Sequence, residues 1–184
     1  MNKFFKIIFI FFSLVLLLYL ALPNPFFPSP PPDAIQSEEP ADAETPLRRA
    51  YFTNYTREEV LKNYQEQLTK SSVLSFKLLL PTYRLNYPPE EAQTLIRDQT
   101  RSTFLEEIVH PLRESVFVNG FEPKDPKDSI FIGGKSWRQK IIIRYVPSNI
   151  FARVSIAAAT LIIISVLTSQ WIGAGVEFKK TWKR

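Results

Sequence analysis

The side chains best suited to chemistry gather in one stretch, residues 106–114. Glu106, Glu107 and His110 lie within four positions of one another, and Arg113 and Glu114 follow. On a helix, residues four apart are neighbours, so Glu106 could orient the imidazole of His110 for acid–base work. The sequence identifies no nucleophile or second metal ligand to complete such a site. The alternative is an exposed helix face braced by ion pairs, so we expect no catalytic residue.

A second group of candidate residues lies around residue 137. Trp137 and Arg138 could contact a partner protein, although a tryptophan at the start of a strand also serves as core packing. The preceding Gly-Gly-Lys-Ser run, residues 133–136, is similar to part of a phosphate-binding loop but lacks its upstream glycine. A strand rather than a helix is expected after it, so we interpret this run as a hairpin turn.

Several kinds of site are excluded by composition. The chain of 184 residues contains no cysteine, which excludes a disulfide framework, a thiolate metal site and a thiol nucleophile. His110 is the only histidine, which excludes any metal site that needs two imidazoles. We therefore expect no metal and no cofactor.

The elements that must position these residues follow from periodicity. Thr56 and Glu59 form a capping box, and the apolar stripe after it predicts a helix. A second helix is predicted from Pro88 to Val116, kinked at Pro111, because its apolar residues recur at helical spacing. Strands are predicted at residues 51–55, 76–87, 130–132 and 139–146, with the last two joined as a hairpin through Gly133-Gly134.

This order of elements predicts an α+β domain over residues 48–148. We expect a small, mainly antiparallel sheet with two helices on one face. Its strand order cannot be decided from the sequence. Before it, residues 23–47 hold many prolines and acidic residues and no base, and this composition predicts an extended linker.

Both ends of the chain carry an apolar segment. Residues 1–22 contain an apolar run close to the ~20 residues that span a bilayer, and residues 150–175 contain a longer one with no charge from Val154 onward. We expect two transmembrane helices. The alternative for the first is a cleaved signal peptide, although bulky Tyr19 poorly suits a cleavage site before Ala21.

The charge distribution predicts how the chain is oriented. Residues 23–153 hold 17 basic and 17 acidic residues, so the whole excess of +5 lies in the two ends. Lys3 and Lys6 precede the first segment, and the tail 176–184 is basic. Basic residues favour the cytoplasmic side, so we expect both termini inside and the central domain outside. The neutral domain argues against nucleic acid as a partner.

Three runs of sequence, LNYPPEEA, RDQTRS and EEIVHPLRESVFVNGFEP, resemble stretches of uncharacterised bacterial envelope proteins with two anchoring helices. The resemblance covers roughly residues 49–175. It implies a two-pass protein of the bacterial cytoplasmic membrane and carries no activity or functional residue.

These observations lead to three hypotheses. The first is an anchored extracytoplasmic protein that binds or scaffolds another membrane or envelope protein, with the bilayer as its other partner. The second is an envelope hydrolase that uses Glu106, Glu107 and His110. The third is a transmembrane sensor subunit, whose short cytoplasmic ends would have to pass a signal to the helices of another protein.

Overall fold

The computed structural model describes residues 3–73, 76–79, 81–88 and 103–182. The chain divides into two compact units, residues 1–23 with 148–184 and residues 24–147, and each is described by itself. The first unit is helical. The second is an α+β domain with a six-stranded sheet, which confirms the predicted fold class.

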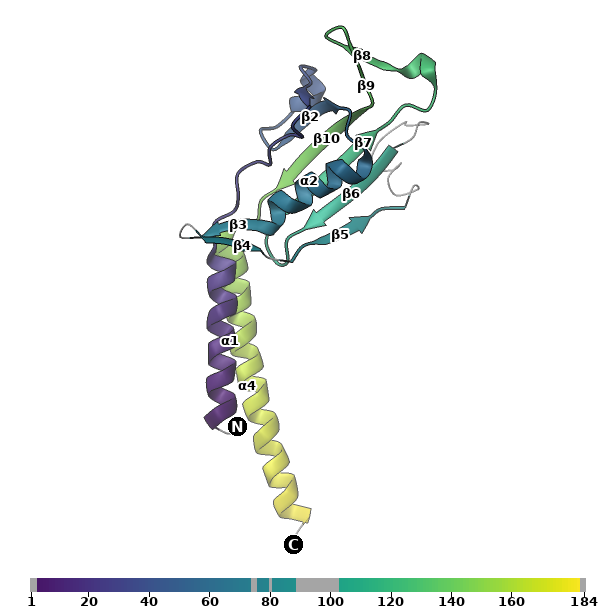
Figure 1. Ribbon diagram of the computed structural model, residues 1–184. Helices are drawn as coiled ribbons and strands as arrows, with labels where there is room; N and C mark the ends of the chain where they lie inside the picture. Colours follow the sequence, from purple (N-terminus) through teal and green to yellow (C-terminus); the bar gives the residue numbers. More distant parts are fainter. Residues whose placement is uncertain (1–2, 74–75, 80, 89–102, 183–184) are drawn as a thin grey trace. The chain divides into compact units, whose positions relative to one another are not determined.

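The helical unit pairs the two ends of the chain. Helix α1 (Lys3–Ala21) lies beside helix α4 (Ile150–Trp182), and the two run antiparallel (Figure 1). The segments Lys3–Ala21 and Ile150–Gly175 are long and apolar enough to cross a membrane. Most of their apolar side chains face outward, as expected for helices surrounded by lipid rather than by a protein core.

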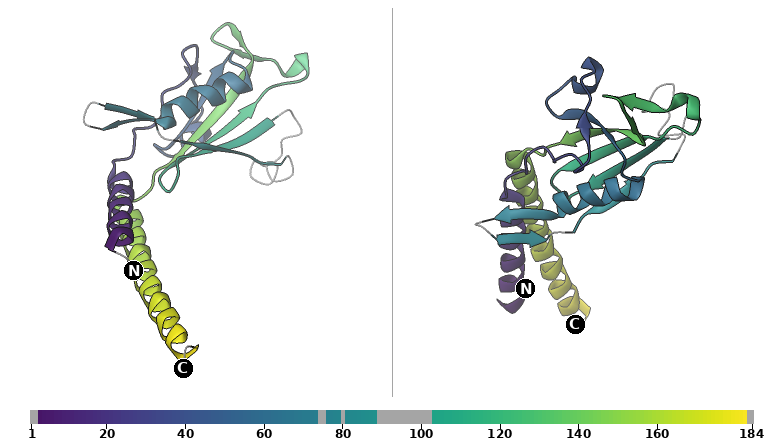
Figure 2. Two further views of the ribbon diagram at one scale, coloured as in Figure 1. Left: turned by 60° about the horizontal axis from the view of Figure 1, so that its bottom comes forward. Right: turned by 45° about the horizontal axis from the view of Figure 1, so that its top comes forward.

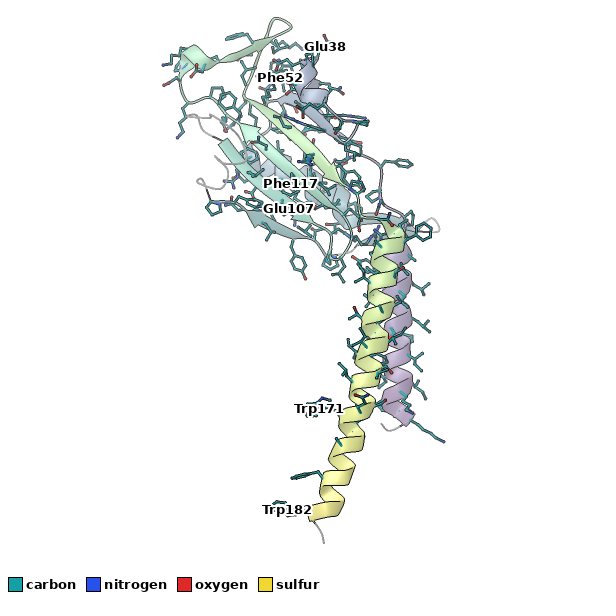
Figure 3. All side chains as sticks on the ribbon, turned by 180° about the vertical axis from the view of Figure 1, so that it is seen from behind. Glu38, Phe52, Glu107, Phe117, Trp171 and Trp182 are labelled. Atoms are coloured by element: carbon teal, nitrogen blue, oxygen red, sulfur yellow. The ribbon has the colours of Figure 1, made fainter. Side chains whose placement is uncertain are left out.

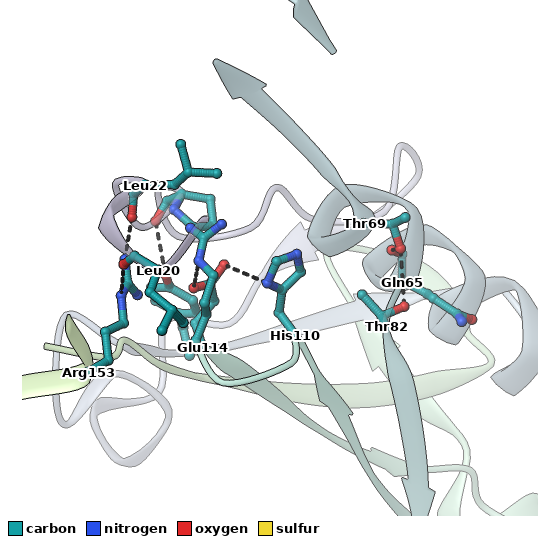
Figure 4. A network of polar contacts seen from close by, with 11 residues as sticks. Leu20, Leu22, Gln65, Thr69, Thr82, His110, Glu114 and Arg153 are labelled. Carbon is teal, nitrogen blue, oxygen red and sulfur yellow. Dashed lines mark hydrogen bonds and ion pairs between the residues drawn. The ribbon is translucent and has the colours of Figure 1, made fainter. Parts of the chain in front are cut away.

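Arg153 joins the two helices at one end of this unit. Its guanidinium donates hydrogen bonds to the carbonyl oxygens of Leu20 and Leu22, at the C-terminal end of α1 (Figure 4). The last carbonyls of a helix lack partners within it, and a cation at a helix C-terminus also opposes the negative end of the helix dipole. Arg153 is only 8% exposed. The arginine therefore caps α1 and holds it against α4.

The sheet of the second unit is antiparallel throughout. Its strand order is β1-β2-β10-β7-β6-β5, so β10 and β7 lie at the centre. Two small hairpins, β3-β4 and β8-β9, lie outside it. The strands are β1 (Ile35–Gln36), β2 (Arg48–Thr53), β3 (Lys70–Val73), β4 (Phe76–Leu79), β5 (Tyr83–Asn86), β6 (Thr103–Val109), β7 (Ser115–Phe121), β8 (Ile130–Ile132), β9 (Lys135–Trp137) and β10 (Gln139–Val146).

Helix α2 (Arg57–Thr69) covers one face of the sheet (Figure 2). The predicted capping box is present, because the amide of Glu59 donates to the Thr56 hydroxyl and the amide of Thr56 donates to the Glu59 carboxylate. Burying one large apolar side chain contributes about 1.5–3 kcal/mol. The helix buries a stripe of four: Val60, Leu61, Tyr64 and Leu68.

The core lies between α2 and the strands. In β7 and β10, side chains alternate between the helix side and the opposite face, so every second residue is buried. Burial raises the pKa of the Tyr64 hydroxyl far above its ordinary value. The core consists of the four helix residues with Tyr51, Ile108, Val116, Val118, Ile141, Ile143 and Tyr145.

The predicted second helix is wrong in its described part. Residues 89–102 lie outside the described residues, but residues 103–121 form β6 and β7 with a tight turn between them. Pro111 begins this turn, in which the amide of Arg113 donates to the His110 carbonyl, 3.1 Å away. Leu112 has a positive φ of 58°. Pro111, which suggested a kink in a helix, therefore lies at a chain reversal. Among the described residues, α2 covers this face of the sheet, where two helices had been predicted.

The Gly133-Gly134 turn is present, but it joins different strands from those predicted. It connects β8 to β9, and both glycines have the positive φ that such a turn favours. Strand β10 begins at Gln139, two residues after the end of β9, and pairs with β2 and β7 in the main sheet. The predicted strand at 76–87 is divided into β4 and β5, with Pro81 between them.

The proline-rich segment is not a free spacer. It contains β1 and the 3₁₀ helix η1 (Pro40–Ala43), and its side chains contact the domain. The Phe27 ring lies edge-on to the Tyr145 ring, with their centroids 6.4 Å apart, and the Asp33 carboxylate accepts hydrogen bonds from the Thr53 hydroxyl and the Asn54 amide. Although rich in proline, this stretch supplies an aromatic side chain and a carboxylate that contact the domain, which composition alone does not reveal.

Candidate functional site: the uncovered face of the sheet

The structure separates the three residues first considered for chemistry. All belong to β6 or the turn after it, not to a helix. Because side chains alternate along a strand, Glu106 points to the α2 side and Glu107 to the opposite face. His110 lies on the Glu106 side, but four strand residues separate the two by roughly 13 Å along the chain. The structure therefore does not bring the three together.

Glu106 is held by arginines. Its side chain is fully buried, and one carboxylate oxygen bonds the guanidinium of Arg57 on α2. The other oxygen lies 3.8 Å from Nε of Arg84 on β5. Arg57 also donates to the side-chain oxygen of Asn86, 3.2 Å away. Two cations facing one buried carboxylate make an ion-pair cluster that connects α2 to the β5 edge of the sheet.

His110 belongs to a second cluster at the β6–β7 turn. Its Nδ1 lies 3.8 Å from a Glu114 carboxylate oxygen, and Nε of Arg113 lies 3.3 Å from the other (Figure 4). The amide of His110 also donates to the Glu114 carbonyl, 2.9 Å away. All three side chains are buried. The cluster therefore stabilises the turn between β6 and β7, at the position where a continuous helix had been predicted.

The face of the sheet opposite α2 carries Glu107 and Phe117 (Figure 3), and the segment around η1 packs over its β2 end. The strand register places one row of side chains across five strands, from β2 to β5. This row consists of Arg48, Arg144, Phe117, Glu107 and Leu85. It is cationic at one end, aromatic in the middle and acidic toward the other edge.

Part of this face is hollowed. A cavity of about 430 Å³ lies between η1 and the central strands, with Arg48 and Arg144 on its wall. We call it the arginine hollow. Apolar and amide side chains form much of the remaining lining: Leu105, Phe117, Asn119 and Ile142.

The two arginines face each other directly across β2 and β10. Like charges in this position repel, so the pair requires anions nearby. Glu44 supplies one, because its carboxylate lies 2.6 Å from the Arg48 guanidinium. Arg144 is exposed and has no ion pair with any residue that the structure describes. The hollow therefore keeps one cation available beside an apolar floor.

The η1 end of the same face is closed by Lys140. Its ammonium lies 2.8 Å from carboxylate oxygens of both Glu39 and Asp42, and 5.6 Å from the centroid of the Phe52 ring. Burial alone would lower the pKa of Lys140, but the hydrogen bonds and charges of Asp42 and Glu39 outweigh it and raise this pKa above its ordinary value. These contacts hold the acidic segment against the sheet, and Glu44 and Thr45, which line the hollow, follow this segment directly in the sequence.

Trp137 and Arg138 lie where β9 leads into β10. Trp137 is buried and its indole N–H donates to the Ile132 carbonyl, 3.2 Å away. The Arg138 guanidinium lies 2.8 Å from a Glu122 carboxylate oxygen, and its amide donates to the side chain of Asn54. Their contacts are with β8 and with neighbouring loops of the same unit, and neither residue lines the arginine hollow.

Sequence reasoning missed the arginine hollow. The helical interpretation of residues 103–116 placed Leu105 and Glu107 on a helix, so their strand neighbours could not be identified. The signal that could have found the strands is the alternation in Ser115–Phe121, where Val116 and Val118 fall on one face and Phe117 and Asn119 on the other. Arg48 and Arg144 lie 96 positions apart in the sequence, and only the pairing of β2 with β10 brings them together.

Within the residues that the structure describes, no three histidine or acidic side chains converge as a metal site would require. No family model matches the chain, and neither a curated protein nor a solved structure matches it.

Proposed function

We propose that this protein is a non-enzymatic, two-pass membrane protein whose α+β unit lies outside the bacterial cytoplasmic membrane and binds an acidic segment of another envelope protein. The two terminal helices support the membrane part of this proposal, because both are long and apolar enough to span. The basic residues beside them support the orientation. The arginine hollow is the proposed binding site.

The observation that carries the proposal is the arginine pair over an apolar floor. A carboxylate between Arg48 and Arg144 would relieve their repulsion, and an arginine can bind it with two parallel hydrogen bonds. Apolar side chains next to that carboxylate would rest on Phe117 and Ile142. The ligand expected from these contacts alternates acidic and apolar groups.

A protein segment fits this face better than a small molecule does. The hollow opens onto a row that continues past Glu107 to Leu85, and Leu85 and Tyr83 on β5 are 50% and 60% exposed. Exposed apolar side chains that continue a polar-rimmed hollow are typical of protein-binding surfaces. Two membrane anchors would also confine the domain close to membrane partners and raise their effective concentration.

The ion pairs of the acidic side chains support a binding role rather than catalysis. The Glu106 carboxylate pairs with Arg57, and the Glu107 carboxylate accepts a hydrogen bond from the Tyr87 hydroxyl, 2.8 Å away. The two glutamates lie on opposite faces of β6, so they would not act on one substrate. We therefore do not propose a hydrolase.

Site-specific photocrosslinking in intact cells tests the binding site. A photoreactive amino acid at Asn119 lies in the hollow, whereas the same group at exposed Glu58 on α2 lies on the covered side and serves as the control. We expect a discrete protein adduct from position 119 only, with its acidic segment identified by mass spectrometry.

Charge reversal tests the arginine. Arg144→Glu should abolish the adduct at position 119, while Lys124→Glu, an equal charge change in an exposed loop, should leave it intact. Equal adducts from positions 119 and 58, or an adduct that survives Arg144→Glu, would contradict the proposed site.

A further inference from the structure

Helix α4 continues well beyond its apolar segment. It contains 33 residues, and its apolar part ends at Gly175, so seven more helical residues follow. At 1.5 Å per residue the whole helix is about 50 Å long and its apolar part about 39 Å, whereas the hydrocarbon core of a bilayer is about 30 Å thick. The apolar part can match the bilayer by tilting, and the direction of the tilt depends on side chains near the interface.

Three large aromatic residues form one stripe on this end of α4. Trp171, Phe178 and Trp182 are spaced by seven and four residues, which places them on one face of a helix. They are 81%, 67% and 80% exposed, so α1 does not cover them. The rings of Phe178 and Trp182 lie 6.2 Å apart, and Figure 3 shows Trp171 and Trp182 on the same side of the helix.

An upright helix would leave this stripe partly in water. With Trp171 at the interface, Trp182 would lie about 16 Å farther along the axis, beyond the headgroups. Aromatic side chains at this level favour the interface, and the chain here also carries four basic residues against Glu177 alone. The basic residues are Lys179, Lys180, Lys183 and Arg184. Aromatic and basic residues together are typical of helices that lie on anionic lipid surfaces.

We propose that the end of α4, from Trp171 to Trp182, binds the cytoplasmic membrane surface by inserting its aromatic stripe among anionic lipid headgroups. The stripe then sets the direction in which α4 tilts. This inference rests on the part of the proposed function in which α4 spans the membrane, but not on the arginine hollow. Basic residues are attracted to an anionic surface, so the net positive charge of this stretch favours anionic over neutral lipid.

Spin labelling of the full chain tests the proposal, because the chain has no cysteine to remove. One label is placed at Phe178→Cys, in the stripe, and its control at Lys180→Cys, which the helix period places on the opposite face. Accessibility to oxygen and to a water-soluble nickel complex is compared in phosphatidylcholine vesicles with and without phosphatidylglycerol.

We expect the oxygen-to-nickel accessibility ratio at position 178 to rise at least about tenfold with phosphatidylglycerol, and the ratio at position 180 to change little. Trp171→Ser with Trp182→Ser should remove the rise, whereas Trp137→Phe, in the other unit, should preserve it. Equal water exposure at both positions in anionic vesicles would overturn the inference. So would shielding of position 178 from both reagents in either lipid, which indicates a protein partner.

Vesicle flotation separates this inference from the proposed function. A chain that stays with the vesicles after alkaline washing while position 178 remains in water refutes the inference alone. A chain that the wash removes refutes the membrane span and the inference together.

Discussion

Gly120 allows two strands to pack closely around an aromatic ring. It pairs with Phe104 across β7 and β6, and a Cβ added at Gly120 would overlap the Phe104 ring. Overfilling a packed site costs about 1–3 kcal/mol. Gly120→Ala should therefore lower the free energy of unfolding of the α+β unit by about this amount, measured by urea denaturation of the full chain in detergent.

The matched control is Gly173→Ala, because a Cβ at Gly173 in α4 meets no atom within 4 Å. Its unfolding midpoint should equal that of the parent chain. If Gly120→Ala unfolds at the parent midpoint, the close approach of Phe104 to β7 is wrong.

Glu106 has a structural role, so its substitution should lower the stability of the α+β unit. Glu106→Gln removes the charge of a fully buried carboxylate that pairs with the partly exposed guanidinium of Arg57, and it should cost about 2 kcal/mol of unfolding free energy. Glu107→Gln, on the opposite face, keeps an oxygen to accept the Tyr87 hydrogen and should change stability by less than about 0.5 kcal/mol. Denaturant midpoints measure both, and equal effects at the two positions would contradict the assignment.

At the scale of elements, the capping box of α2 gives stability a pH dependence. Hydrogen bonds from the Thr56 backbone and side chain hold the pKa of Glu59 below its ordinary 4.5. A carboxyl whose pKa is lowered in the folded state stabilises that state at pH values above its ordinary pKa. This contribution is lost as the pH falls through the lowered pKa. We expect Glu59→Gln to lose less stability than the parent chain between about pH 6 and pH 3, measured by denaturant midpoints.

Thr56→Ala, which removes the hydroxyl acceptor of the same cap, should cost about 1 kcal/mol at neutral pH. Glu58→Gln, one residue before Glu59 and outside the capping box, is the matched control for the acid titration. Identical acid sensitivity in the parent chain and Glu59→Gln would show that the cap does not contribute.

Arg153 should determine how closely α1 and α4 pair. Arg153→Gln removes the guanidinium that bonds the carbonyls of Leu20 and Leu22. Spin labels at Leu18→Cys and Ile156→Cys, both on outward positions, should then give a broader distance distribution in lipid nanodiscs. Arg144→Gln is the control. An unchanged distribution in Arg153→Gln would mean that apolar packing alone holds the pair.

The elements also show which structures were predictable from the sequence. Helix α2 and the apolar ends were predicted because their signals are local: a capping box with one stripe, and long runs without charge. Strands β6 and β7 were not. Leu105, Ile108, Leu112 and Val116 recur at helical spacing, but Ile108 and Val116 face the core from two strands, and Leu112 lies exposed in the turn.

The candidate site was unpredictable for a different reason. The arginine hollow combines side chains from β2, β6, β7 and β10 with the segment after η1. Glu44 and Thr45 are close to Arg48 in sequence, but the contributions of β6, β7 and β10 come from residues 105–144. Their approach depends on strand register, which composition and periodicity do not determine. The residues proposed from local spacing, Glu106 and His110, belong instead to two separate ion-pair clusters.

The whole molecule consists of two terminal helices and one α+β unit that lies between them in the sequence. If both terminal helices span the membrane as proposed, the unit stays tethered to the membrane. A permanently tethered domain can bind a membrane partner with modest contact area, because the tether supplies effective concentration. An open face with one available cation is consistent with such a role.

In the proposed topology both termini lie inside the cell and the α+β unit lies outside, and cysteine accessibility can distinguish this arrangement from its inverse. Single cysteines at Lys3, Lys124 and Trp182 are treated in cells with a membrane-impermeant maleimide before and after permeabilisation. The account predicts that position 124 reacts in intact cells and that positions 3 and 182 react only after permeabilisation, all on full-length chain. Reaction of position 124 only after permeabilisation would place the arginine hollow in the cytoplasm and contradict the account.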